Sequence, residues 1–123
     1  MENRKIYTSY FGGLKKLPNT ITPISICGKS IPGWTGLEFK KLAPSWSIYK
    51  EYKDSFDQER YIRRYQAEIL GKLNPQETLG EILNLSKGDI ALVCYEKPGD
   101  FCHRHLVASW LPYEITEYNY ENT

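Results

Sequence analysis

A short apolar run, Ile90 to Cys94, constrains the fold of this chain more than any other feature. Its five residues are too few for a helix, and they show no alternation of apolar and polar side chains. Such a run is typical of a strand that is buried on both faces, as strands of parallel sheets are. The run therefore predicts a buried strand in a sheet that is covered on both sides.

A tight turn and an amphipathic helix follow this strand. The turn is marked by Pro98-Gly99-Asp100. The helix is marked by apolar residues at helical spacing, namely Leu106, Val107, Trp110 and Leu111. Asp100 is the expected N-cap of this helix, because its carboxylate can accept hydrogen bonds from the free N–H groups of the first turn.

Groups with chemical reactivity gather around this turn. Cys94 and Glu96 end the strand segment, and Cys102, His103 and Arg104 fall in the predicted first helical turn. Ligands of open α/β sheets bind beyond the carboxyl ends of the strands. A helix N-terminus also favours anions, including a thiolate. We predict a functional site here, with Cys102, His103 and Glu96 as catalytic residues and with Arg104 and Cys94 in ligand binding.

Each of these residues also has a structural interpretation. Cys94 and Cys102 could be small core residues, because free cysteine is among the most buried residue types. His103 could be a hydrogen-bonded structural histidine. Arg104 is disfavoured by the helix dipole in a first turn, so we expect it to have an anionic partner, either Glu96 or a ligand.

The segment from Cys94 to Ala108 resembles the signature of a bacterial and phage family, the domain of unknown function 488. Members of that family carry a Cys-x-Glu segment followed by Cys-His-Arg at the start of a helix. The likeness extends to residues 6–11, 23–26 and 42–46 and to the pair Tyr61 and Tyr65, so it covers nearly the whole chain.

This resemblance implies a small α/β domain with a polar pocket. The family also leads us to expect an arginine after the second strand. Here the chain departs from the family pattern and has Cys27-Gly28-Lys29 instead. We therefore expect anion binding at this position only if Lys29 substitutes for that arginine.

Length and composition point to one soluble domain, residues 1–123. Sixteen basic and fifteen acidic residues give a net charge of +1, so no global field draws the protein onto nucleic acid. Three cysteines make an odd set that suggests no disulfide framework. The chain has no secretory signal and no apolar run near the ~20 residues that span a bilayer, so we expect a cytoplasmic protein and no membrane partner.

The first half of the chain predicts two further strands and a long connection. Residues 5–11 and 21–27 read as strands. Three residues at the end of the first strand are candidates to border the ligand pocket: Thr8, Ser9 and Tyr10. Residues 31–55 form a long connection in which Trp34 and Trp46 either cover the pocket or, as the safer interpretation, pack as anchors.

The second half adds two helices and an edge strand. Residues 56–73 form the longest predicted helix, whose apolar stripe contains Tyr61 and Tyr65. Core packing is the default for both tyrosines, and presentation of their hydroxyls to a ligand is the alternative. Asn74 is expected to cap the next helix, with Pro75 in its first position. Residues 113–118 read as an edge strand.

This order of elements predicts an α/β fold, a small and largely parallel sheet flanked by helices in a Rossmann-like sandwich. We expect the site to bind, or act on, a small anionic or nucleotide-like molecule, without a cofactor or metal. A zinc site of Cys94, Cys102 and His103, with or without Cys27, is a weaker hypothesis, because paired zinc ligands are usually two to four residues apart and Cys94 and Cys102 are eight apart. The other alternative is a non-catalytic interaction module. In that case Arg60, Arg63 and Arg64 would contact a protein or, less favoured, a nucleic acid.

Overall fold

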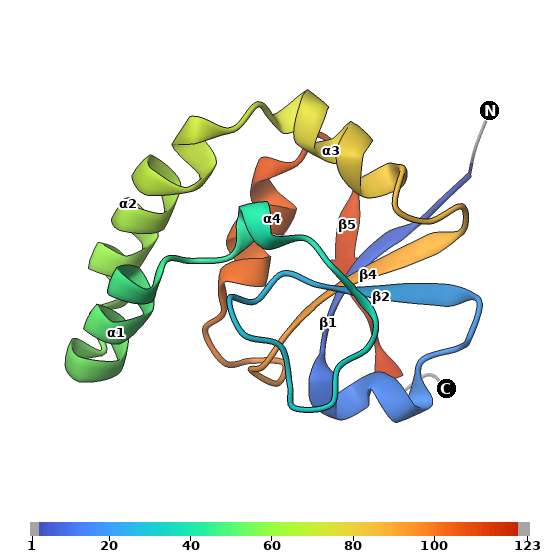
Figure 1. Cartoon of the computed structure of the whole chain (residues 1–123), viewed down its shortest axis with the longest axis horizontal. Helices are drawn as coiled ribbons and strands as arrows, with labels where there is room; N and C mark the ends of the chain where they lie inside the picture. Colours follow the sequence, from blue (N-terminus) through green and yellow to red (C-terminus); the bar gives the residue numbers. More distant parts are fainter. Residues whose placement is uncertain (1–2, 121–123) are drawn as a thin grey trace.

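Five parallel strands form one sheet in the order β3-β2-β4-β1-β5, as the computed structural model shows for residues 3–120. Figure 1 shows the ribbon of the fold, with helices beside the sheet. The strands are β1 (Ile6–Tyr10), β2 (Ile21–Ser25), β3 (Leu37–Glu38), β4 (Asp89–Cys94) and β5 (Ile115–Glu117). Every pair of neighbouring strands runs parallel. The described residues are therefore a single small α/β domain with a Rossmann-like fold, which confirms the predicted fold class.

Strand β4 lies at the centre of the sheet, between β1 and β2. All five residues from Ile90 to Cys94 are buried, so the predicted burial on both faces is confirmed. In register, Tyr10 of β1 lies beside Cys94, and Ser25 of β2 lies beside Val93. The carboxyl ends of the three inner strands thus meet at one edge of the sheet, where the predicted site residues follow.

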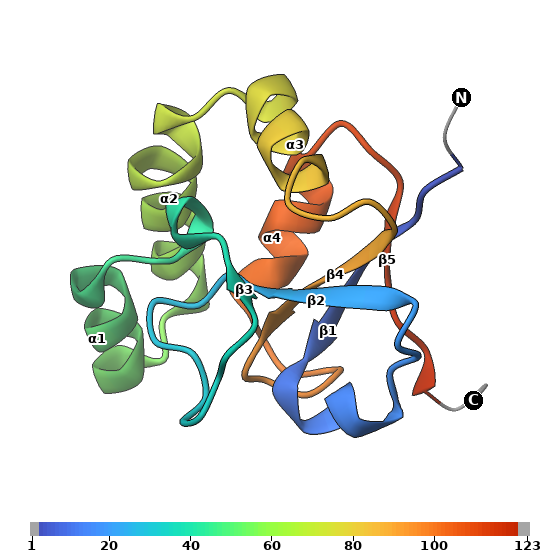
Figure 2. The ribbon, with the colours of Figure 1, turned by 45° about the vertical axis from the view of Figure 1, so that its right-hand side comes forward.

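Within residues 3–120, four α-helices and three short 3₁₀ helices accompany the sheet. Figure 2 shows the α-helices beside the sheet. The α-helices are α1 (Trp46–Ser55), α2 (Gln58–Glu68), α3 (Pro75–Leu83) and α4 (His103–Trp110). The 3₁₀ helices are η1 (Phe11–Lys16), η2 (Lys40–Leu42) and η3 (Leu70–Lys72). Helix α4 contacts β1, β4 and β5, while α1 and α2 pack against each other beside it.

The apolar interior is divided by the sheet into two clusters. One holds Ile90 and Leu92 of β4 together with buried residues of all four α-helices, such as Tyr65 and Val107. The other holds Ala91, Val93 and both cysteines of the predicted site, and it packs against residues of η1. The alternation along β4 sends neighbouring side chains to opposite faces, which is why both faces need a cover.

The boundaries of several helices differ from those predicted. The connection 31–55 contains β3, η2 and the ten-residue α1. The predicted helix 56–73 is shorter, because α2 ends at Glu68 and η3 follows. Asn74 caps α3 as predicted, since its side chain accepts from the Glu77 N–H at 2.9 Å. The edge strand predicted within 113–118 is β5.

The two tryptophans of the connection behave differently. Trp34 packs against Phe11, with ring centroids 5.3 Å apart, and therefore anchors the connection as predicted. Trp46 is 70% exposed, so the anchoring role predicted for it is wrong. As the first residue of α1, Trp46 lies opposite the helix face that buries Ile48.

Candidate functional site

The candidate site is formed where β4 ends and α4 begins. Cys94 is the last residue of β4, residues 95–100 form an exposed loop, and α4 starts at His103. Phe101 packs its ring at 5.2 Å from that of Tyr52 and at 5.0 Å from that of Tyr61. This contact anchors the end of the loop against α1 and α2.

The predicted N-cap of α4 is wrong. Cys102, with φ −154° and ψ 145°, is the N-cap, and its side chain makes no capping hydrogen bond. Asp100 is exposed, and its backbone N–H donates to the Lys97 carbonyl within the turn. The anchoring of Phe101 keeps the chain extended through Cys102, so the helix begins three residues after Asp100.

Three potential ligand or catalytic groups converge at this point. Cys94 Sγ, Cys102 Sγ and a ring nitrogen of His103 all lie within 4.8 Å of one another. Cys94 and Cys102 are joined by a disulfide, which the odd cysteine count did not suggest, while Cys27 is free and buried. We call Cys94, Cys102 and His103 the sulfur–imidazole cluster.

The imidazole of His103 is oriented by a backbone carbonyl. Its Nε2 lies 2.8 Å from the Ile26 carbonyl oxygen, which can only accept, so Nε2 carries the hydrogen. Its Nδ1 therefore has a free lone pair, and this atom lies 3.8 Å from Cys102 Sγ. Burial lowers the pKa of His103 to about 4, which keeps the ring neutral at neutral pH.

Arg104 is paired with a residue that the sequence did not indicate. Its Nε and Nη2 donate to the two carboxylate oxygens of Glu117, at 3.1 and 2.9 Å. Its Nη1 donates to Cys94 Sγ at 3.3 Å and to the Glu96 carbonyl oxygen at 2.5 Å. An anionic partner was correctly expected, but its identity was wrong: the exposed Glu96 contributes its backbone rather than its carboxylate.

The cluster is closed rather than open to solvent. The exposed fractions are 1% for Cys94, 3% for Cys102, 6% for His103 and 0% for Arg104. Two surface hollows lie elsewhere. One is between α2, η3 and α4, and the other is at the amino ends of β1 and β5. Neither hollow is lined by these four residues, so the predicted pocket is a buried cluster under an exposed loop.

The candidate ligand-binding residues of β1 contact β5 and Tyr120, which follows β5. Thr8 and Ser9 are buried; Thr8 Oγ1 donates to Glu117 at 2.5 Å, and Ser9 shares a 2.6 Å hydrogen bond with the Tyr120 hydroxyl. Tyr10 packs its ring against that of Tyr120. Thr8 therefore joins the Arg104–Glu117 pair, whereas Ser9 and Tyr10 contact the segment that follows β5.

The remaining candidates are divided between surface and core. Lys29 is exposed, and Lys40 contacts the segment after β2, where its Nζ donates to the Gly28 carbonyl at 2.7 Å. Tyr61 and Tyr65 are buried and stacked, in agreement with their default interpretation, and burial raises the pKa of both. The Tyr65 hydroxyl donates to the Leu42 carbonyl at 2.5 Å, and its ring lies 5.5 Å from that of His103.

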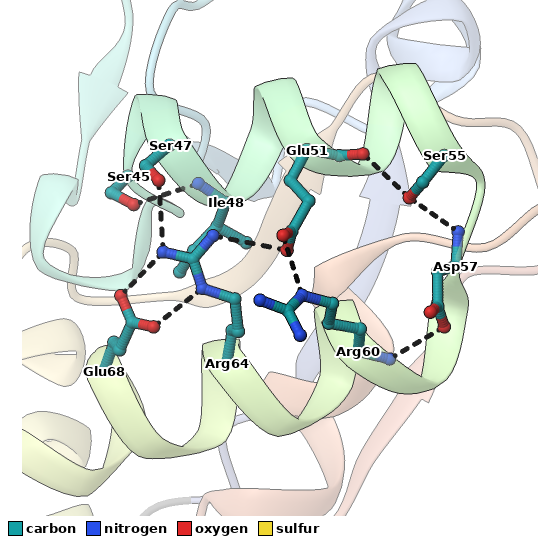
Figure 3. Close-up of polar contacts among 9 residues, drawn as sticks. All are labelled: Ser45, Ser47, Ile48, Glu51, Ser55, Asp57, Arg60, Arg64 and Glu68. Carbon is teal, nitrogen blue, oxygen red and sulfur yellow. Dashed lines mark hydrogen bonds and ion pairs between the residues drawn. The ribbon is translucent and has the colours of Figure 1, made fainter.

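Two of the arginines of α2 are occupied within the protein (Figure 3). Glu51 of α1 accepts from Arg60 Nε at 2.7 Å and from Arg64 Nη1 at 3.3 Å. Glu68 accepts from Arg64 Nε at 2.7 Å. The contacts to Glu51 hold α1 against α2. Arg60 and Arg63 of the predicted contact face are exposed, and Arg64 is half-buried.

Sequence reasoning missed Glu117, Lys40 and the Ile26 carbonyl. The only signal for Glu117 was the need of Arg104 for an anion, because nothing local indicates that β5 lies beside β1. Ile26, which directly follows β2, reaches the site through its carbonyl, whereas Lys40 contacts the backbone carbonyl of Gly28 in the segment after β2. No helix within residues 3–120 has the length and apolar character that crossing a membrane requires.

Comparison with known proteins gives one result. Residues 17–114 match the family described as the active DUF488-N3 subclade, DUF488-N3a. The matched range includes β2, β4 and α4, and with them the sulfur–imidazole cluster. Neither a curated protein nor a solved structure matches the chain.

Proposed function

Because the chain belongs to the DUF488 family, within its active DUF488-N3 subclade, we propose that it binds and acts on a small anionic or nucleotide-like molecule. The reacting centre in this proposal is the sulfur–imidazole cluster at the carboxyl end of β4. One observation carries the proposal: two sulfurs and an imidazole nitrogen lie within 4.8 Å of one another at the edge of the sheet where α/β proteins bind ligands. The description of the subclade as active supports a reacting centre over a purely structural cluster.

The preference for an anion rests on positive charge and free donors at the same place. The first N–H groups of α4 receive no side-chain cap, and such groups bind anions. The Arg104 guanidinium adds a positive charge beside Cys94, although its partner Glu117 already neutralises part of it. In the proposal the helix N-terminus binds the anion directly, and Arg104 positions the cysteine.

Access to the cluster requires movement of the loop 95–100. This loop is exposed throughout and carries Tyr95, which is 45% exposed and packs against Phe11. A tyrosine ring in this position offers a face on which a nucleobase could stack. We also place the protein in the cytoplasm, because a reducing compartment keeps Cys94 and Cys102 available as thiols.

Thermal denaturation with a ligand panel tests the proposal. The reduced full chain, with a chelator present, would be melted with inorganic phosphate, nucleoside mono-, di- and triphosphates and nucleobases. A ligand at a hundred times its Kd adds about 2.7 kcal/mol of stability, which raises the melting temperature by roughly 10 °C in a domain of this size.

Two variants connect the response to the cluster. We expect Cys102→Ala to abolish any turnover of the ligand that binds, whereas Cys27→Ala, which removes a buried thiol outside the cluster, should retain it. Failure of every member of the panel to raise the melting temperature would refute the proposal. Equal turnover by Cys102→Ala would exclude the cluster as the reacting centre.

A second candidate function is an interaction module, which the outer face of α1 favours. Trp46 and Tyr49 of α1 are exposed, with ring centroids 5.7 Å apart, and Phe56, the C-cap residue that follows the helix, is exposed as well. Exposed aromatic residues are typical of protein interfaces. Sedimentation velocity over a range of concentrations tests the version in which the partner is a second copy, and a Trp46→Gln variant should then remain monomeric.

A further inference from the structure

We propose that the reduced sulfur–imidazole cluster binds a divalent metal ion of the zinc class. This inference rests on the proposed function only in using the same cluster. The three side chains offer two thiolates and one imidazole nitrogen, a mixture that zinc prefers. All three are buried, and their ligand atoms already lie within 4.8 Å of one another.

The backbone spacing of the two cysteines suits a shared ion. Their Cα atoms are 7.5 Å apart, whereas disulfides usually join Cα atoms about 4.4 to 6.8 Å apart. With zinc–sulfur bonds of about 2.3 Å and tetrahedral angles, two thiolates on one ion have sulfurs roughly 3.8 Å apart. Once the disulfide is reduced, the wide Cα spacing allows the sulfurs to separate to this distance without a change in the fold.

The orientation of His103 has the form that metal ligands take. Histidines that bind metals usually donate their second ring N–H to a carbonyl or carboxylate, which fixes the ring. Here Nε2 donates to the Ile26 carbonyl, and Nδ1 faces Cys102 Sγ at 3.8 Å. Zinc ligand distances imply a sulfur–nitrogen separation of roughly 3.6 Å, so the ring needs almost no adjustment.

The charges of the neighbouring groups balance in the metal-bound state. Two thiolates neutralise a divalent ion, and the adjacent Arg104 is neutralised by Glu117 at 2.9 Å. The Arg104 N–H that contacts Cys94 Sγ at 3.3 Å would stabilise a thiolate there. A buried site of this composition carries no net charge, which avoids the main cost of placing ions in a protein interior.

The cluster supplies three ligands among residues 3–120, and this number points to a reactive metal. Structural zinc sites have four protein ligands, while catalytic sites have three and leave one position for water or substrate. The buried thiol of Cys27 does not belong to the group. One coordination position would therefore remain for a water molecule.

Binding follows a defined chemical sequence. A phosphine or small thiol supplies two electrons, two protons are taken up, and the Cys94–Cys102 bond opens to two thiols while the reductant is oxidised. The ion then displaces both thiol protons into the buffer and forms two metal–sulfur bonds and one metal–nitrogen bond. The disulfide form of the chain cannot make these sulfur bonds, so it serves as a folded control of identical sequence.

Metal titration of the full chain tests the inference. Protein freed of metal and reduced with a phosphine under anaerobic conditions would be titrated with zinc and, in parallel, with cobalt(II), whose thiolate charge-transfer absorption reports the ligands. We expect one equivalent to bind to wild type and to Cys27→Ala. Cys94→Ser, Cys102→Ser and His103→Ala should each bind at least tenfold more weakly.

Several outcomes would overturn the inference. The first is that reduced wild type binds far less than one equivalent of zinc. The second is that the oxidised protein binds zinc as tightly as the reduced protein does. The third is that Cys94→Ser, with a native fold by circular dichroism, binds zinc as tightly as wild type. The ligand panel is measured with chelator and without metal, so the two proposals fail independently. Metal binding without a ligand response would refute only the proposed function, and a ligand response without metal binding would refute only this inference.

Discussion

At the scale of single residues, the pair Arg104–Glu117 dominates the energetics of the site. Arg104 is fully buried, and its charge is balanced by one carboxylate that also accepts from Thr8. Removing one partner of a buried pair leaves an uncompensated charge. We therefore expect Glu117→Gln to lower the free energy of unfolding by about 3 kcal/mol, as measured by urea denaturation.

A surface ion pair gives the matched control for this variant. Lys41 and Glu81 form a 2.8 Å pair whose side chains are both about half exposed. Breaking it with Glu81→Gln should cost less than about 1 kcal/mol. Equal losses for the two variants would mean that Arg104 does not depend on Glu117.

A second residue-scale prediction concerns the free thiol of Cys27. Burial raises its pKa from 9.0 to about 12. Above pH 9 the unfolded chain therefore loses this proton while the folded chain keeps it, so stability falls as the pH rises toward 12. Between pH 8 and pH 10, wild type should lose about 1 kcal/mol more than Cys27→Ala does.

Urea denaturation of both proteins at the two pH values measures this difference. The ionisation of tyrosines contributes equally to wild type and variant, so it cancels from the comparison. If both proteins lost the same stability between pH 8 and pH 10, the thiol of Cys27 would have to ionise as readily in the folded chain as in the unfolded one.

The sequence indicated which residues gather at the candidate site, but it did not indicate which residues they contact. The run from Cys94 to Arg104 indicated a strand, a turn and a helix, and these local signals place Cys102 and His103 together. The cap at Asp100 was wrong because the packing of Phe101 against Tyr52 and Tyr61, which is not local, delays the helix. Local sequence chemistry therefore indicated which residues gather at the end of β4, and tertiary packing determined their partners.

At the scale of elements, the end of α1 carries a strained residue. Phe56 has φ 57°, and it is the one non-glycine with positive φ among residues 3–120. The left-handed conformation costs about 1 kcal/mol for a residue with a Cβ, and glycine avoids that cost. Phe56 is 71% exposed and contacts Tyr52 through one ring edge, so little packing depends on it.

We accordingly expect Phe56→Gly to raise the free energy of unfolding by roughly 0.5 to 1 kcal/mol, measured by urea denaturation. Phe56→Ala keeps the Cβ atom and should give no gain, so it separates backbone strain from the loss of the ring. A Phe56→Gly protein less stable than Phe56→Ala would show that the ring matters more than the backbone.

Helices and strands with strong local signals were predicted well. Asn74-Pro75 marked the start of α3, and the apolar run marked β4, because capping chemistry and burial are encoded within a few residues. The segment 31–55 was harder to predict. Strand β3 is two residues long, and it depends on pairing with β2 instead of on its own composition.

At the scale of the whole molecule, the strand order lies beyond local reasoning. Neighbours in the sheet such as β1 and β4 are separated by about eighty residues, and nothing in either segment identifies the other. The order explains why Glu117, far from the signature in sequence, neutralises Arg104. Parallel pairing of distant segments also predicts slower folding than in a helical protein of equal length.

The position of β1 between β4 and β5 has a practical meaning for anyone who wishes to trim this protein. An expression fragment limited to the family match, residues 17–114, would lack β1 and β5. Strand β4 would lose its hydrogen bonds to β1, and Arg104 would lose its counterion Glu117. Circular dichroism should find that fragment unfolded and residues 3–120 folded. We therefore expect the smallest fragment that folds by itself to be longer than the matched range, because it must include both β1 and the edge strand β5.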